Sequence, residues 1–324
     1  MATTFAPGDV VIDNELVRLG IVETLEQNVN GFNASSNGTI TLGSRRIEND
    51  FSHESFIKAL AASDLVKRRD YTSNATVTPA KIIEDFENTI KLSRIYGPIS
   101  TTYDAWNRSG RSVEVASLAF GKQLGVAIQA DMLNTLLVAG GAAIEATQAN
   151  VGAGTAVFDY KDIVSGLVTF GDKMGEIKML VMHSNTYASM IDKGLSMNAL
   201  ENVGGATIRE GGAYSLGLPV LVTDSPALKV GADKFKIMGL TEAALSAVES
   251  DATIMKVQDV LLKENLQKII QGEGSYNVSV KGCKFDESKH NPADTDLGAK
   301  ANWGYVYSDV KSSAGFQIIV KARA

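Results

Sequence analysis

Hydrophobic residues follow a helical spacing near the start of the chain. Over residues 13–29 they recur every three or four positions with charged residues between them, which predicts a helix capped by Asp13 or Asn14. The tract 30–38, with two glycines and several small polar residues, is expected to break that helix and form a flexible link. An amphipathic helix needs a surface for its apolar face, which is either the protein's own core or a neighbouring subunit.

Residues 39–95 combine short strand patterns with charges of both signs. Strands are predicted at 39–42, 76–78 and 88–93. The charges between them nearly cancel: Arg45, Arg46, Lys67, Arg68 and Arg69 against Glu48, Asp50, Glu54, Asp64 and Asp70. Such mixed charge is typical of a solvated face, but on a long hairpin it also suits docking onto a neighbour of complementary charge. It is a poor nucleic-acid patch, because the carboxylates repel phosphates.

The longest helical pattern runs from Ser112 to about Val138 and contains no proline. It follows a strand-breaking segment at 96–98 and a loop at 106–110, and it is expected to end at the glycines and alanines of 139–143. A helix of about 27 residues would form a rod of about 40 Å. Such a rod is longer than a compact domain needs, so we expect a spine to which other parts attach.

From residue 151 onward helices and strands alternate, which predicts a mixed α/β domain. A small-residue linker at 151–154 precedes a helix capped by Asp159 and closed by Gly171. The elements that follow are a strand at 177–182, a helix capped by Ser184 that ends near Gly194, a glycine-rich turn, and strands at 218–223 and 235–238. Later residues favour strands at 276–281 and 315–320, with turns at Gly272 and Gly274.

Composition excludes several classes of protein. The 324 residues suffice for two domains, and 44% hydrophobic and 21% charged residues describe an ordinary globular protein. A net charge of -6 gives no general attraction to nucleic acid or to an anionic membrane. The longest apolar tracts, such as 136–144, are shorter than the roughly 20 residues that span a bilayer. Residues 1–9 lack the pattern of a secretory signal, so we expect a soluble protein made in a reducing compartment.

Neither the cysteine nor the histidines predict a metal site. The single cysteine, Cys283, excludes an intrachain disulfide and a cysteine-based zinc site, and it is interpreted as a small buried apolar residue. His53, His183 and His290 lie far apart in the sequence and form no helical pair, so a metal site is not expected. His183 is expected to cap or pack at the end of a strand.

A serine hydrolase is the strongest enzyme hypothesis, and its motif is incomplete. Ser215, Asp224 and His290 follow the chain order of an α/β-hydrolase triad. However, Ala213 replaces the first glycine of the Gly-x-Ser-x-Gly elbow, and a strand rather than a helix follows Ser215. We therefore interpret the segment as a tight glycine turn that leads into a core strand.

Three other motifs are weaker. Gly152-Ala153-Gly154 begins a dinucleotide fingerprint, but Val157 stands where the third glycine is needed. Gly121-Lys122 lies inside the long helix without the upstream glycine of a phosphate loop. The aromatic residues that could stack on bases or sugars are Trp106, Trp303, Tyr305 and Tyr307. The last three alternate along a strand pattern, which favours a packed sheet face.

One ordered set of motifs extends across most of the chain. The strand 177–182 leads into His183-Ser184-Asn185-Thr186-Tyr187, and residues 216–224 read Leu-Gly-Leu-Pro-Val-Leu-Val-Thr-Asp. In this order the segments resemble the central domain of tailed-bacteriophage major capsid proteins, with their "His-Ser-x-x-Tyr" helix and "Leu-Gly-x-Pro-Val-x-Val-x-Asp" strand. Further segments that are similar to podovirus-type members lie at 13–38, 67–73, 91–99, 123–135, 235–245 and 297–303.

The resemblance implies an α+β protein with the Hong Kong 97-like capsid fold. The implied parts are an N-terminal arm at 1–38, an extended loop at 39–95, a peripheral domain with the spine helix at 96–150, a mixed α/β axial domain at 151–255, and a final segment at 256–324. That final segment would supply return strands to the peripheral domain and a C-terminal strand to the axial domain.

The resemblance also implies a structural protein and not an enzyme, without catalytic, cofactor-binding or metal-binding residues. Copies would assemble through a procapsid into hexamers and pentamers of an icosahedral phage head that encloses double-stranded DNA without sequence-specific binding. Implied partners are the chain itself and scaffold, portal and decoration proteins, with no membrane. The implied location is the virion capsid, after synthesis and assembly in the bacterial host cytoplasm. The alternatives are an encapsulin-like compartment of the same fold and a cytoplasmic α/β hydrolase.

Overall fold

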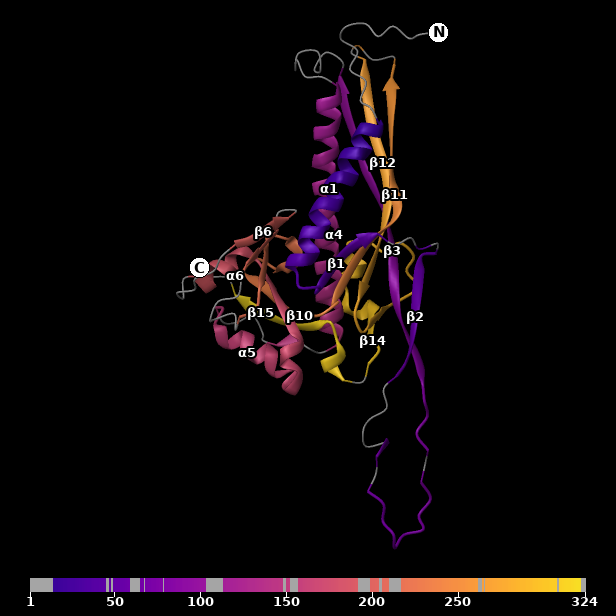
Figure 1. Cartoon of the computed structure of the whole chain (residues 1–324), viewed down its shortest axis with the longest axis vertical. Coiled ribbons are helices and arrows are strands. Elements are labelled where there is room, and N and C mark those ends of the chain that lie inside the picture. The colour runs from indigo at the N-terminus through magenta and orange to yellow at the C-terminus, as the bar shows by residue number, and fades with distance from the viewer. Residues whose placement is uncertain are drawn as a thin grey trace.

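The computed structural model describes residues 14–324 apart from 45–46, 48, 59–64, 67, 78, 103–112, 148–149, 152–156, 192–198, 204–205, 210–216, 262–263, 265, 308 and 322–324. Figure 1 shows an elongated molecule with a column of helices and strands, a lobe beside the base of the column, and a long hairpin that points away from the column. Helices and sheets both build the fold, in agreement with the predicted α+β class.

The first sheet has five strands in the order β1-β11-β12-β3-β2. β1 pairs in parallel with β11, and the other neighbours are antiparallel. Figure 1 shows that β3, β11 and β12 form one side of the column, while β2 and β3 lead into the hairpin. The bounds are β1 Ile40–Ser44, β2 Phe51–Ile57, β3 Glu84–Thr102, β11 Leu245–Val260 and β12 Gln267–Val280. The strands predicted at 39–42, 88–93 and 276–281 are confirmed within this sheet.

Two predictions near the hairpin were wrong. Thr76 and Val77 lie in an irregular part of the hairpin and not in a strand, while Thr78 is outside the described residues. Residues 96–98 do not end the strand, because β3 continues through them and stays paired with β12 across a register shift. Gly97 has a φ of 86° there, a conformation that glycine adopts without strain.

Gly272 and Gly274 lie inside β12 and not at turns, so that prediction was also wrong. A Cβ on Gly272 would come within 2.1 Å of the Met255 sulfur, and one on Gly274 would come within 3.0 Å of the Tyr96 ring. Both glycines therefore make room for large side chains from the neighbouring strands β11 and β3. The signal that suggested turns is a packing requirement between strands.

Helix α1, Asn14–Ser35, is longer than predicted and passes through Gly31. The expected flexible link at 30–38 is wrong, because Phe32 is buried and the side chain of Asn33 binds strand β1. The Asn33 amide donates to the Leu42 carbonyl at 2.6 Å and accepts from the Leu42 N–H at 2.9 Å. These contacts fix the turn, which ends at Gly38, and the buried core supplies the surface for much of the helix.

Helix α4, Val113–Ala146, has 34 residues and is about 51 Å long. The predicted end at 139–143 is wrong, because the helix continues through these residues. Glycine is needed at position 140 for packing, since a Cβ there would lie 2.8 Å from the Leu245 side chain. α4 contacts strands of both large sheets, including β11, β12 and β15. Segment 117–146 is long and apolar enough to span a membrane, with a mean hydropathy of 1.3. However, 72% of its apolar stretch is buried within the protein.

The lobe is built on an eight-stranded sheet in the order β4-β15-β10-β5-β8-β7-β6, with β9 paired to β10. β5 is parallel to β8 and antiparallel to β10. The strands are β4 Asn150–Val151, β5 Ile177–Met182, β6 Ala199–Val203, β7 Ala206–Arg209, β8 Val220–Thr223, β9 Lys229–Val230, β10 Lys234–Thr241 and β15 Gly315–Lys321. The strands predicted at 177–182, 218–223, 235–238 and 315–320 are confirmed.

Helices α5, Tyr160–Val168, and α6, Ser184–Ile191, belong to the lobe (Figure 1). α5 has the predicted Asp159 cap, and the Asp162 carboxylate accepts the Asp159 N–H at 2.8 Å. The predicted linker residues 152–154, the end of the second helix near Gly194, and most of the glycine-rich turn before β8 lie outside the described residues.

Short elements complete the chain. A two-stranded sheet pairs β13, Cys283–Phe285, with β14, Trp303–Tyr305. The remaining elements are α7 Asp294–Leu297, and the 3-10 helices η1 Gly171–Glu176, η3 Pro226–Leu228, η4 Lys300–Asn302 and η5 Val310–Ser312. Trp303 is buried against Phe285 with ring centroids 5.1 Å apart, so the predicted packed face is confirmed at this residue. Trp106 lies outside the described residues.

Candidate functional site

The structure does not assemble the hydrolase triad from the residues it describes. His290 Nδ1 lies 3.1 Å from Asp50, just before β2 of the five-stranded sheet. Asp224 follows β8 of the eight-stranded sheet, where its carboxylate lies 3.6 Å from His183. Ser215 lies outside the described residues. The candidate base and acid therefore lie beside different sheets and contact different partners. Among the described residues, no three His, Cys, Asp or Glu side chains cluster as a metal site would require.

His183 acts at the end of a strand, as predicted. Its Nδ1 accepts the Asn185 N–H at 3.2 Å at the start of α6, so His183 and not Ser184 provides the cap. The ring packs on Phe235 with centroids 4.5 Å apart. Burial lowers the pKa of His183 below its ordinary value, Asp224 opposes that shift, and Lys229 reinforces it. The imidazole is therefore a neutral packing residue.

Cys283 is buried beneath the sheets, in agreement with the prediction. Burial raises the pKa of its thiol to about 12, with a further contribution from Glu87. A thiol in this state is a poor nucleophile, because thiolate is the reactive form. Cys283 therefore contributes packing and not chemistry.

A polar cluster around Arg94 of β3 joins four elements: β3, α4, α7 and β12. Arg94 donates to Asp131 of α4 at 2.9 Å and to Asp294 of α7 at 2.9 Å. The Tyr276 hydroxyl donates to the same Asp131 at 2.7 Å, and the Thr135 hydroxyl lies 3.0 Å from the Tyr276 hydroxyl. Burial opposes the charge on Arg94, but Tyr276, Asp131 and Asp294 together raise its pKa. The cluster fixes the spine helix to β3 and β12.

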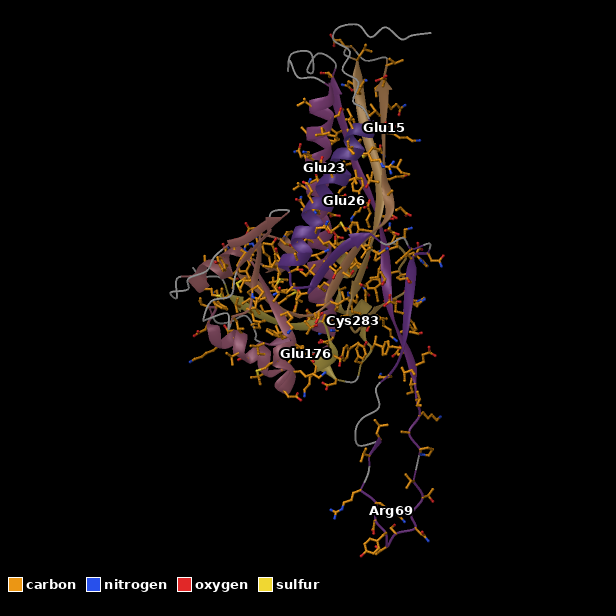
Figure 2. The ribbon with its side chains drawn as sticks, in the orientation of Figure 1. Glu15, Glu23, Glu26, Arg69, Glu176 and Cys283 are labelled. Atoms are coloured by element: carbon orange, nitrogen blue, oxygen red, sulfur yellow. The ribbon has the colours of Figure 1, made fainter. Side chains whose placement is uncertain are left out.

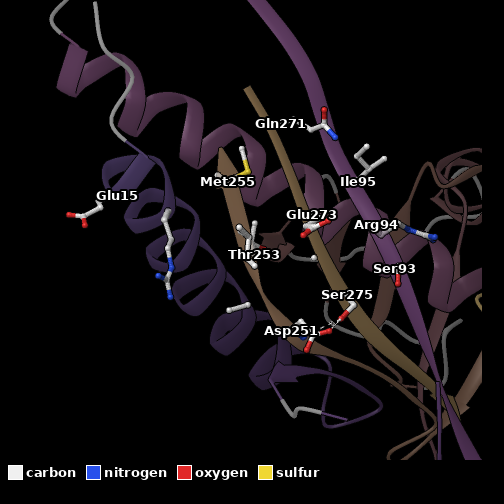
Figure 3. Close-up of a pocket in the computed structure, with 14 residues that line it drawn as sticks. Glu15, Ser93, Arg94, Ile95, Asp251, Thr253, Met255, Gln271, Glu273 and Ser275 are labelled. Atoms are coloured by element: carbon white, nitrogen blue, oxygen red, sulfur yellow. Dashed lines mark hydrogen bonds between the residues drawn. The ribbon is translucent and has the colours of Figure 1, made fainter. Parts of the chain in front are cut away.

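A groove of about 900 Å³ lies between the start of α1 and the strands β3, β11 and β12. Figure 3 shows Glu15 on the helix side and Asp251, Glu273 and Ser275 on the strand side. Asp251 binds Ser275 at 2.6 Å and Lys91 at 2.7 Å, so its charge is already compensated. The Ser275 hydroxyl and the Asp251 carboxylate are therefore parts of one network that includes Lys91.

The chain exposes large apolar side chains along its length, which the sequence pattern alone did not locate. They occur on the hairpin (Ile57, Leu65, Val66, Tyr71, Val77, Ile82 and Ile83), on α1 (Leu19 and Val22), and on the column strands and the loop between β11 and β12 (Ile95, Ile99, Ile254, Leu261 and Leu266). The most exposed are Tyr71 at 89% and Val66 at 81%. Large exposed apolar patches mark protein contact sites, and seven of these side chains lie on the hairpin. We take this surface as the candidate functional site.

Reciprocal contacts hold the root of the hairpin. His53 of β2 lies 2.6 Å from Glu287, and His290 lies 3.1 Å from Asp50 just before β2. The segment 50–53 and the segment 287–290 thus each contribute one imidazole and one carboxylate, three residues apart. Asn88 of β3 adds a hydrogen bond of 2.8 Å to the Phe285 carbonyl. The hairpin therefore has a fixed root, although its far end has no partner within the described chain to cover its apolar residues.

Comparisons with known proteins identify a family and a fold. The family model described as major capsid protein 13-like matches residues 9–317. A solved chain of Mycobacterium phage Adephagia is similar at 9% identity over 90% of both chains, with a TM-score of 0.53. A chain of Mycobacterium phage Cain is similar at 10% identity over 88% of this chain and 89% of its own, with a TM-score of 0.52. No curated protein matches the chain.

The two phage structures establish the fold alone, because their sequence identity is low. The family match covers nearly the whole chain and therefore establishes membership. The column, lobe and hairpin are parts of one chain of this family, and exposed apolar surface of this kind is typical of protein contact sites. The chain belongs to the major capsid protein 13-like family, has the Hong Kong 97-like capsid fold, and is a structural protein of a bacteriophage capsid.

Proposed function

We propose that this chain assembles into hexamers and pentamers that close into an icosahedral phage head around double-stranded DNA. The observation that carries the proposal is the apolar surface of the hairpin, exposed at Tyr71 and Val66 above all, in a chain of a capsid family. A single subunit leaves this surface in water, whereas an array of identical subunits covers it. Assembly is thus the state in which the sequence buries its apolar residues.

We also propose a division of labour within the subunit. The N-terminal arm, 1–38, would pack across subunits, and the extended loop, 39–95, would reach over a neighbour. The peripheral domain, 96–150, contains the spine α4, and the axial domain, 151–255, contains most of the lobe. Residues 256–324 return to both, since β12 pairs within the five-stranded sheet and β15 pairs with β10.

The proposed role requires neither sequence-specific DNA binding nor catalysis by the chain. Its net charge of -6 supports a wall that encloses DNA without binding a particular sequence. It would carry no enzymatic activity, and it would assemble in the bacterial host cytoplasm with scaffold, portal and decoration proteins. The procapsid would form before DNA enters.

Electron microscopy of the purified chain tests the proposal. We expect closed icosahedral shells, and shells from infected cells should protect double-stranded DNA from nuclease. Shells that contain folded protein cargo and no DNA would indicate an encapsulin-like compartment instead. A Ser215→Ala variant should assemble as the parent does. A stable monomer with esterase activity that this substitution abolishes would overturn the proposal.

A further inference from the structure

Two Asn-Gly steps lie close together in the sequence, Asn30-Gly31 and Asn37-Gly38. Asn-Gly is the step at which a backbone nitrogen most readily attacks the preceding side-chain amide, because glycine has no Cβ to obstruct the approach. The fold places the two steps in different surroundings. The first lies inside helix α1, and the second forms the turn that joins α1 to β1. The chain thus contains one reactive dipeptide twice, in two conformations.

The first step is protected by the helix. Figure 2 marks the course of α1 along the column by Glu15, Glu23 and Glu26. Asn30 follows these residues in the last turns of the same helix. In an α-helix each N–H is directed at the carbonyl four residues earlier, so the N–H of Gly31 is engaged within α1. The next residue, Phe32, is buried, and opening of the helix at this point would therefore disturb the core.

The second step is a tight turn with an exposed tip. The φ angles are 52° at Asn37 and 70° at Gly38, and the Thr39 N–H donates to the Ser36 carbonyl at 3.1 Å. Two positive φ angles at the central residues define a type I′ turn, for which Asn-Gly is a preferred sequence. Ser36 and Thr39 are fully buried, whereas Asn37 and Gly38 are exposed. The fold therefore holds the flanking residues and presents the reactive step to solvent.

The two reacting groups of this turn are not engaged elsewhere. Among the described residues, neither the Asn37 carboxamide nor the Gly38 N–H has a hydrogen-bond partner. A Cβ on Gly38 would have no atom within 4 Å, so the space beside the turn is open. Rotation about the Asn37 Cα–C bond brings the side-chain amide to the Gly38 nitrogen. This rotation opens a two-residue tip and leaves the helix intact, so it belongs to the least stable local motions of the fold.

We propose that Asn37 is a site of spontaneous deamidation, a modification that needs no enzyme. The Gly38 nitrogen loses its proton and forms a bond to the side-chain carbonyl carbon of Asn37. The carbon–nitrogen bond of the carboxamide breaks, the amide nitrogen takes up a proton and leaves as ammonia, and a cyclic succinimide remains. Water then opens the succinimide. Opening at the side-chain carbonyl gives aspartate, and opening at the main-chain carbonyl gives isoaspartate, whose backbone is longer by a methylene group.

The modification alters a joint between two tight turns. The Gly38 carbonyl accepts the Ala243 N–H at 2.8 Å, and Ala243, with a φ of 52°, lies in the turn between β10 and β11. Next to this contact, β1 pairs with β11, beginning at Ile40 and Leu245. A longer backbone at position 37 displaces the Gly38 carbonyl, so deamidation weakens the attachment of β1 to β11. The inference needs the folded subunit alone and does not depend on the proposed assembly.

Mass spectrometry of aged protein tests the site, and the chain supplies its own control. Trypsin leaves residues 19–45 as one peptide, which contains both Asn-Gly steps. The full chain is aged at mildly alkaline pH in water enriched in a heavy oxygen isotope and is digested in ordinary water, so only deamidation before digestion is labelled. We expect labelled product at Asn37 on the order of tenfold faster than at Asn30. In urea the two rates should be similar, because the helix is lost.

Two outcomes would overturn the site. One is an equal rate at Asn37 and Asn30 in the folded chain, and the other is no labelled product at Asn37 under conditions in which both asparagines react in urea. The rate at Asn37 should also rise with pH, because the attacking nitrogen must lose its proton. A rate that is independent of pH would contradict the mechanism.

Hydrogen exchange tests the consequence for the fold. Asn37→Gly introduces a residue that accepts a positive φ and has no carboxamide, so this variant keeps the turn and cannot react. Exchange in β1 should become faster in the aged parent and stay unchanged in the aged variant, with β5 as the internal reference. Equal exchange in fresh and fully deamidated parent would refute the weakening of β1.

Discussion

The lobe buries its apolar residues within the chain, whereas the hairpin exposes them. In the lobe, β5 and β10 are buried over most of their length, with helices and loops of the same chain around them. In the hairpin, Leu65, Val66, Tyr71 and Val77 are exposed, and strand pairing ends at the Ile57–Glu84 step. The lobe is therefore stable through its own core, whereas the hairpin depends on a partner for its burial. Substitutions should affect folding in the first region and assembly in the second.

Phe316→Ala should have the largest effect on folding. The Phe316 ring is fully buried between Gly166 of α5 and Gly239 of β10, where an added Cβ on either glycine would lie within 2.4 Å of the ring. Removing the ring leaves a cavity and should cost about 3–5 kcal/mol of the free energy of unfolding. Denaturant unfolding of the unassembled chain measures it. Tyr71→Ala is the contrast: it should change that free energy by less than about 0.5 kcal/mol and still lower shell yield.

Gly121→Ala should have the next largest effect, through the contact between α1 and α4. An added Cβ would lie 2.4 Å from the Val17 carbonyl oxygen, so the helices would have to move apart. We expect a loss of about 1–3 kcal/mol, despite the higher helix propensity of alanine. Gly175→Ala is the matched control, because nothing lies within 4 Å of its added Cβ. Equal stabilities of the two variants would show that the helices are not in close contact.

The helix-interior glycines show why part of the fold is not predictable from sequence. Gly31 and Gly140 suggested helix ends, but each lies inside a helix whose packing overrides the propensity of glycine. The reason at Gly140 is Leu245, which lies more than 100 residues away in sequence. The lobe strands β5 and β10, by contrast, were predicted closely, because a short apolar run between turn signals is a local pattern.

The site shows the same division between local and distant causes. The mixed charge of the hairpin was visible in the sequence, and the docking onto a neighbour that it suggested stays a prediction. Which residues are exposed was not visible, because exposure depends on where β2 and β3 separate. The Arg94 cluster gave no signal, since its partner Asp294 lies 200 residues away. Contacts at that distance follow from the completed fold alone.

Tyr276→Phe should have a smaller effect than the core substitutions. The hydroxyl donates to Asp131 at 2.7 Å and contacts Thr135 at 3.0 Å, while the ring lies beneath the Arg94 guanidinium. Asp131 and Thr135 both keep Arg94 as a partner, so loss of the hydroxyl should cost about 0.5–1.5 kcal/mol. The measurement is the denaturation midpoint of the unassembled chain. An unchanged midpoint would mean that water replaces the hydroxyl and that the cluster does not hold α4 to β12.

His183 should make the stability of the lobe depend on pH. Because burial lowers its pKa, the unfolded chain binds a proton more tightly than the folded chain does. The stability contributed by the neutral imidazole is present above the ordinary histidine value near 6.5 and is lost as pH falls through the lowered pKa. His183→Gln should flatten the fall in unfolding temperature between pH 7 and pH 5. An equally steep fall in the variant would assign the dependence to other groups.

The smallest effect is expected at the root of the hairpin. His53 and Glu287 lie 2.6 Å apart, but both side chains are substantially exposed, so their coupling should be about 0.2–1 kcal/mol in a double-mutant cycle with Gln at each position. Asp172 and Lys311 provide a comparably exposed pair in the lobe. Salt should weaken both couplings. Removing His53 and His290 together should speed hydrogen exchange in β2 and leave β10 unchanged, because β2 is held by the loop at 286–291 through these two histidine contacts. Unchanged exchange in β2 would show that its pairing with β3 alone holds the root. The two histidine contacts would then not be needed to orient the hairpin.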